Sequence, residues 1–268
     1  MDDSGALGEY MSSVLSEKAR AHLTLRESDP FQGQVRRLDR LTSGLLSLIW
    51  QSWAQSSRHR PIVDNFLMYA GTDYAIESLV SIQALVPHGS QNVARRECRF
   101  MLEQAVKHLY VDQQLPSASE HDRSARLSYL RNQVDRSSIE PIWSTSVYLP
   151  ADRLQEFRRD AKNAWSQMAK FIHPSVDQIQ IIIQRTRRDA PIGFEAVSDL
   201  TKLVDELARI YDILGVLWLT ACGPSAAGDI LVGEDVDGWP FVRTKWLPEM
   251  STTFDYKHER KEFPRASR

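Results

Sequence analysis

The sequence lacks most of the motifs that identify enzymes and metal proteins. It has only two cysteines, Cys98 and Cys222, and no CxxC pair, which argues against a zinc finger or a disulfide framework. Its seven histidines form no HExxH and no paired ExxH, which counts against a zinc protease and a di-iron carboxylate bundle. A Walker loop, GxGxxG and GxSxG are also missing, so nucleotide hydrolases, Rossmann enzymes and α/β-hydrolases lose support.

The chain also lacks a charge bias and a long apolar run. Its 33 basic and 35 acidic residues leave a formal net charge of −2, whereas a protein that coats nucleic acid is usually basic. The longest apolar segment, 210–222, falls short of the roughly 18 residues that a membrane span needs, so we expect no membrane partner. Because both cysteines lie in helical patterns as reduced thiols, we expect a cytoplasmic protein.

The sequence does contain helical periodicity along most of its length. Apolar residues recur at helical spacing in the segments 5–24, 34–56, 61–86, 91–115, 151–172 and 195–221. These segments predict an all-α multi-helix bundle with N-terminal helices in 1–58, a bundle core in 59–224 and a tail in 225–268. In the tail, the runs 229–233 and 239–243 flank Asp237-Gly238, which predicts a short C-terminal β-hairpin or an irregular appendage.

Two of these helices carry polar residues that are candidates for a functional site. Arg99 and Glu103 are four residues apart and therefore share one helix face, together with Val106 and Tyr110, which indicates a partly buried surface. They form either an exposed intrahelical ion pair or a buried pair that faces His173 across the bundle. The sequence alone leaves both interpretations open.

A second polar row follows the 151–172 helix. Arg159, Ser166 and His173 are spaced seven apart and so stack along one side, with Lys170 beside them. Such a row can hold a phosphate or a nucleotide, with His173 as an acid–base group near neutral pH. The alternative is an ordinary solvated face that ends in a histidine favourably placed at the helix C-terminus.

At these residues the chain resembles the bacterial all-helical proteins of the HEPN-like superfamily. The resemblance rests on the Arg99-x-x-x-Glu103 helix and on the segment 166–175, which ends in His173-Pro-Ser, and it covers roughly residues 60–220. It implies a four- or five-helix bundle, commonly a dimer. Many members are ribonucleases or nucleotide-transfer toxins in phage defence and toxin–antitoxin systems, and others are non-catalytic.

The catalytic signature of that superfamily separates an arginine from the histidine by four to six residues. Ser166, Gln167 and Met168 occupy the corresponding positions here, so His173 matches the motif and its arginine partner does not. Arg99 could replace that arginine only if the fold brings it close to His173.

These observations lead to two main hypotheses, neither of which requires a cofactor or a metal. The first is an interaction or regulatory protein in bacterial defence or stress response, a homodimer with a further protein partner. The second is a metal-independent RNA- or nucleotide-directed enzyme. Its catalytic residues would be His173, Arg99 and Glu103, and its substrate-binding residues would be Lys170, Arg159, Ser166 and Tyr110. A third, less favoured hypothesis is a small-molecule site lined by tryptophans and tyrosines.

Overall fold

The computed structural model describes residues 20–134, 139–171, 196–233 and 239–254, and the isolated residues 9, 13, 17, 176, 179, 180 and 183. Within these residues the regular elements are helices and no strand occurs, which confirms the all-α prediction. None of the helices in this part of the chain is both long and apolar enough to cross a bilayer.

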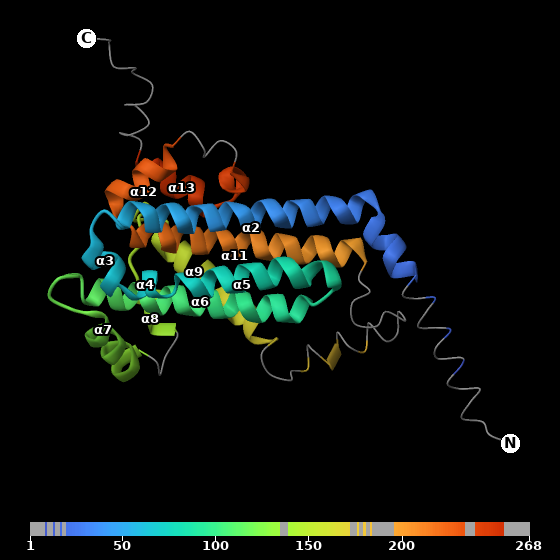
Figure 1. Cartoon of the computed structure of the whole chain (residues 1–268), viewed down its shortest axis with the longest axis horizontal. Helices are drawn as coiled ribbons and strands as arrows, with labels where there is room; N and C mark the ends of the chain where they lie inside the picture. The colour runs from blue at the N-terminus through green and yellow to red at the C-terminus, as the bar shows by residue number, and fades with distance from the viewer. Residues whose placement is uncertain are drawn as a thin grey trace, which may run out of the picture.

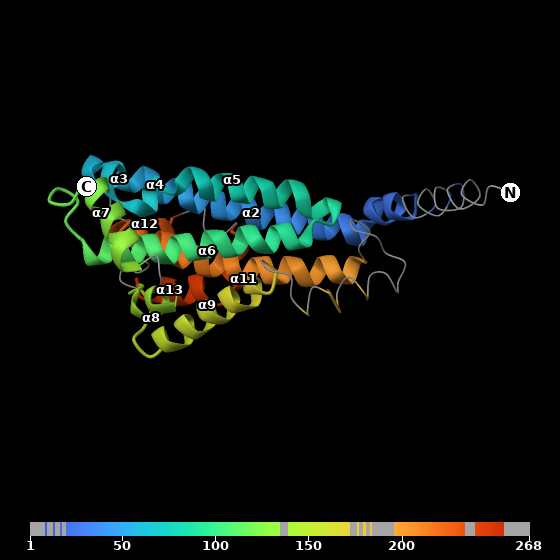
Figure 2. The same cartoon turned by 90° about the horizontal axis from the view of Figure 1, so that it is seen from below.

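Within the described residues the bundle has five longer helices, which are labelled in Figure 1. They are α2 (Asp29–Ser56), α5 (Thr72–Leu85), α6 (Gln91–Gln114), α9 (Leu154–Ala169) and α11 (Val197–Ala221). The helices α2 and α11 lie side by side at the centre, and α5 and α6 cover one side of this pair. Figure 2 shows α9 running obliquely beside α6 and α11.

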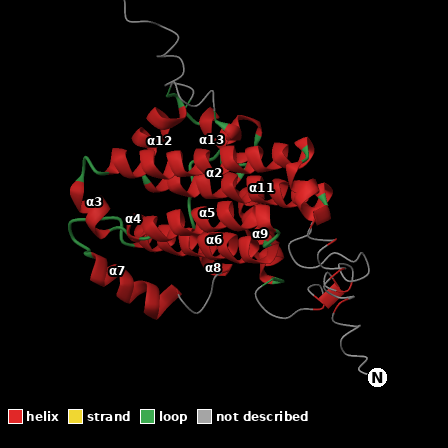
Figure 3. Cartoon of the chain, turned by 45° about the vertical axis from the view of Figure 1, so that its right-hand side comes forward, coloured by secondary structure: helices red, strands yellow, loops and turns green. Residues whose placement is uncertain are grey.

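Besides the helical residues 20–27, short helices lie around this bundle. They are α3 (Arg60–Asn65), α4 (Leu67–Ala70), the 3₁₀ helix η1 (Val86–His88), α7 (Arg123–Tyr129), the π-helix η2 (Leu130–Val134), α8 (Ile139–Ser144), α12 (Pro224–Leu231), the 3₁₀ helix η4 (Pro240–Arg243) and α13 (Trp246–Thr252). The helix α12 packs against α2 and α11, and α13 packs against α11, on the side of the bundle that faces away from α5 and α6 (Figures 1 and 3).

In the described parts of the two runs that were expected to form a hairpin or an irregular appendage, the structure has α12 and η4 and not strands. The helix α12 begins with Pro224 directly after Gly223, whose positive φ of 85° turns the chain. Ala227, Ile230 and Leu231 follow at helical spacing and are buried, so the segment packs through one face of a helix. The expected turn at 234–238 and the end of the tail, 255–268, lie outside the described residues.

The described part of the C-terminal segment belongs to the core. Phe241, Trp246, Leu247 and Met250 are all at most 3% exposed. Two glycines on the central helices permit this approach. A Cβ at Gly44 of α2 would lie 2.8 Å from the Pro240 ring, and one at Gly215 of α11 would lie 2.8 Å from Leu247.

The predicted continuous helix over 61–86 is divided into α3, α4 and α5. The division before α4 has a clear cause in the buried carboxylate of Asp112, which projects from α6. Asp112 accepts hydrogen bonds from the backbone N–H groups of Leu67 and Met68, at 2.9 Å each, and thereby caps α4 from another helix. Arg126 of α7 lies 3.4 Å from Asp112, and its side chain is completely buried.

Asp212 of α11 caps α13 in the same way. It is 1% exposed and accepts hydrogen bonds from the backbone N–H groups of Lys245, Trp246 and Leu247 at 2.7–3.0 Å. The hydroxyl of Thr244 donates a fourth hydrogen bond at 2.7 Å. The α13 helix has no capping side chain of its own at its N-terminus, so this contact fixes the helix to the core.

Replacing Asp212 with alanine should destabilise the protein strongly. Three backbone N–H groups and one hydroxyl would lose their buried acceptor, so we expect the free energy of unfolding to fall by about 2–4 kcal/mol. Urea denaturation measures this loss. Asp212→Asn, which keeps one acceptor oxygen, should lose less, and equal losses in the two variants would contradict the capping role.

The stability conferred by Asp112 should depend on pH. Burial raises the pKa of its carboxyl to about 6, against the opposing effects of the two backbone hydrogen bonds and of Arg126. The folded state therefore binds more protons than the unfolded state between about pH 4 and 6, and the contribution of this group decreases as the pH rises through that window.

We thus expect the wild type to lose free energy of unfolding relative to Asp112→Asn as the pH rises from about 4 to 7. Urea denaturation of both proteins at each pH gives this difference directly. A difference that does not change with pH would contradict the raised pKa.

Candidate functional site

The predicted pair Arg99–Glu103 lies where α6 packs against α9. Arg99 Nε is 3.8 Å from Glu103 Oε2, and the two side chains are 16% and 28% exposed. The guanidinium of Arg99 stacks on the ring of Trp165 from α9, 4.1 Å from the ring centroid. The indole N–H of Trp165 donates to Glu103 Oε2 at 3.3 Å, and Lys107 Nζ lies 2.8 Å from Glu103 Oε1.

These contacts make one cluster, the α6–α9 contact, formed by Arg99, Glu103, Lys107 and Trp165. Both carboxylate oxygens of Glu103 are engaged, and one face of Arg99 is covered by an indole ring. Ion pairing and aromatic stacking therefore hold α6 and α9 together, which is a structural role.

Arg95 extends the same pattern by one helical turn. Its guanidinium lies 4.5 Å from the ring centroid of Phe171, and its Nε donates to Glu206 of α11 at 2.8 Å. Arg95 is only 8% exposed. Arg95 and Arg99, one turn apart on α6, thus stack on the rings of Phe171 and Trp165.

None of the other predicted site residues that the structure describes belongs to the α6–α9 contact. Arg159 and Ser166 are exposed on α9 and share its outer face, as their spacing predicted. Lys170 is exposed and follows α9 as its C-cap. Tyr110 lies two turns along α6 from Glu103 and packs with Leu67, Val111 and Val134. His173 lies outside the described residues.

Neither cysteine has the environment of a nucleophile. Burial raises the pKa of the Cys98 thiol far above its usual range, and it raises the pKa of Cys222 to about 12. Within the described ranges, no group of three histidines, cysteines, aspartates or glutamates could hold a metal ion.

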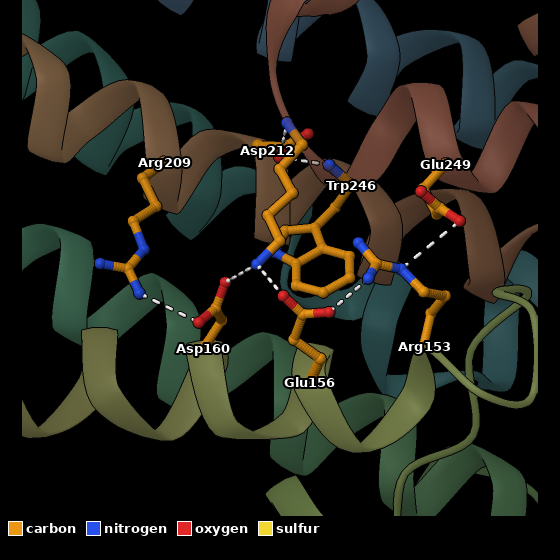
Figure 4. Close-up of polar contacts among 8 residues, drawn as sticks. Arg153, Glu156, Asp160, Arg209, Asp212, Trp246 and Glu249 are labelled. Atoms are coloured by element: carbon orange, nitrogen blue, oxygen red, sulfur yellow. Dashed lines mark hydrogen bonds and ion pairs between the residues drawn. The ribbon is translucent and has the colours of Figure 1, made fainter.

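Charged residues form a second network between α9, α11 and α13 (Figure 4). Lys245 lies at its centre, 2.7 Å from Glu156 and 2.9 Å from Asp160. Arg209 pairs with Asp160 at 3.2 Å, and Arg153 bridges Glu156 and Glu249. Positive and negative groups alternate along this network, so it positions α9 and offers no unpaired cation in its interior.

A surface groove that the sequence analysis did not predict lies between α2, α11 and η4. It encloses about 450 Å³. We call it the arginine groove, and its lining includes Arg37, Arg40, Leu41, Ala208, Trp239, Pro240, Val242, Arg243 and Thr244. Arg40 and Arg243 are exposed and pair with no carboxylate among the residues that the structure describes.

The sequence places only two of the three arginines of the groove on a common face. Arg37 and Arg40 are three residues apart and therefore share a face of α2. Arg243 follows about 200 residues later in a segment that was expected to be a strand. Arg243 lines the same groove because η4 packs against Gly44 of α2.

No protein-family model, curated protein or solved structure matches this chain. The HEPN-like resemblance therefore stays a prediction.

The α6–α9 contact should behave as a stabilising contact. Replacing Glu103 with glutamine removes the charge that attracts Lys107 and Arg99, so we expect the free energy of unfolding to fall by about 1–2 kcal/mol. Hydrogen exchange should also become faster in α9. Ser166→Ala, an exposed change on the same helix, is the control and should shift stability by less than about 0.5 kcal/mol. Equal stability of the two variants would contradict this role.

Proposed function

We propose that this protein is a binding or regulatory helical bundle, and not an enzyme that works through Arg99 and Glu103. The observation that supports this choice is the α6–α9 contact. A general base must reach the proton of a substrate, and an arginine that binds phosphate presents its N–H groups to the ligand. Glu103 is engaged at both oxygens, and Arg99 lies against Trp165.

The outer surface of the bundle fits a protein that meets a partner. Trp50, Tyr74 and Phe100 lie on α2, α5 and α6 and are 60%, 56% and 48% exposed. Trp50 also stacks on Trp53, with ring centroids 5.2 Å apart. Large aromatic residues are enriched in protein interfaces, so these helices are the surface where we place the contact with a partner protein or a second copy.

The biological setting of the proposal comes from the HEPN-like resemblance. That resemblance favours a role in bacterial defence or stress response, in a superfamily that includes non-catalytic members. The competing hypothesis keeps the same setting and assigns RNA or nucleotide chemistry to His173 with Arg99 and Glu103.

Replacing His173 with alanine separates the two hypotheses. For a binding protein we expect the wild type and His173→Ala to leave a mixed RNA substrate equally intact. The two should also have the same effect on growth when overproduced in bacteria. Gel analysis of the RNA and growth curves are the measurements.

The matched variant for this comparison is Glu103→Gln, examined together with its thermal unfolding. RNA cleavage by the wild type that is abolished in both variants, while each stays folded at the assay temperature, would overturn the proposal in favour of the enzyme.

A further inference from the structure

The arginine groove combines positively charged arginines with an apolar wall, as a binding site for a small anion does. We infer that it binds a nucleoside diphosphate, with the phosphates on the arginines and the base against the apolar wall. This inference rests on the proposed binding function, because it names a ligand for a bundle that acts by binding. It uses a different surface from the α6–α9 contact.

The positive charge of the groove comes from both of its sides. Arg37 and Arg40 project from one face of α2, and Arg243 comes from η4. Arg40 and Arg243 are exposed and have no carboxylate partner among the described residues, so their N–H groups are available to a ligand. A guanidinium is less strongly hydrated than an ammonium and can bind a phosphate through two parallel hydrogen bonds.

Within the part of the chain that the structure describes, Asp205 is an acidic neighbour of the groove. Arg37 Nη1 lies 2.6 Å from Asp205 Oδ1, and the two side chains are 37% and 58% exposed. A pair this exposed to water contributes little to stability. A phosphate can therefore replace Asp205 as the partner of Arg37, although the carboxylate opposes its binding.

Apolar residues form the remaining wall. Trp239, Pro240 and Val242 line the groove beside the arginines, and Trp239 is held in place because it is only 8% exposed. A flat aromatic base gains from contact with such a wall. The volume of about 450 Å³ lies within the range of about 300–1,000 Å³ that is usual for small-molecule sites. The groove is thus larger than a bare phosphate requires.

The backbone under the groove is fixed before any ligand arrives. Thr244 donates its hydroxyl to Asp212, and Pro240 packs against Gly44 of α2. Arg243 lies between these two anchored positions. A ligand therefore meets a backbone that is already ordered, which reduces the entropic cost of binding.

Isothermal titration calorimetry with ADP, without divalent cations and at two salt concentrations, tests the inference on the full chain. We expect the wild type to bind ADP more weakly at the higher salt. Arg40→Gln and Arg243→Gln should each weaken binding by about 10- to 100-fold, the usual effect of losing a charged hydrogen bond. Asp205→Asn should tighten binding several-fold, because it removes the opposing carboxylate.

Arg36→Gln is the matched control, since Arg36 is an exposed arginine of the same helix that does not line the groove. It removes the same charge and should leave ADP binding within about twofold, allowing only for a screened long-range effect. Thermal unfolding of each variant should stay at the wild-type temperature, because all of the altered side chains are at the surface.

Four outcomes would overturn the inference. The first is no ADP binding by the wild type, and the second is an equal loss of affinity in Arg36→Gln and Arg40→Gln. The third is equal affinity for ADP and pyrophosphate, and the fourth is displacement of ADP by a short polyglutamate peptide at comparable concentration. Either of these last two results would mean that the groove binds another anion and not a nucleotide. The binding function would survive any of them, because the His173→Ala comparison tests it separately.

Discussion

A buried carboxylate that caps a helix from a neighbouring helix is the interaction on which this fold depends. Asp112 and Asp212 each project from a long core helix and accept the first N–H groups of a short one. A charge in a protein core is costly unless several donors surround it, and the free N–H groups of a helix N-terminus supply them. Helices as short as α4 and α13 are unstable alone, so these two contacts determine where they form.

The Asp212 contact is connected through further contacts to α9 and α6. It positions Thr244 and Lys245, and Lys245 then joins Glu156 and Asp160 of α9 (Figure 4). The position of α9 in turn brings Trp165 over Arg99 of α6. The arginine groove lies at the start of this series, because η4 directly precedes the capped segment.

The α6–α9 contact shows why polar residues on a helix are ambiguous in a sequence. Arginine, glutamate and a nearby tryptophan are residues of active sites, and they also join helices by stacking and charge. Spacing predicted that Arg99 and Glu103 share a partly buried face, and the structure has them at 16% and 28% exposure. Lys107 is four residues after Glu103 on the same helix, so its pairing with Glu103 is also local. Only the structure shows that Trp165 of α9 joins this cluster.

The sequence by itself determined the all-α class, most of the long helices and the shared face of Arg99 and Glu103, because periodicity is a local property. The tertiary structure decided that the segment after Pro224 is helical, since its apolar residues are buried against α2 and α11. It also decided the break before Leu67, through Asp112 more than 40 residues later in the chain. The arginine groove was also decided by the tertiary structure. Arg40 and Arg243 line the same groove because distant segments of the chain pack together, and no local sequence pattern predicts such packing.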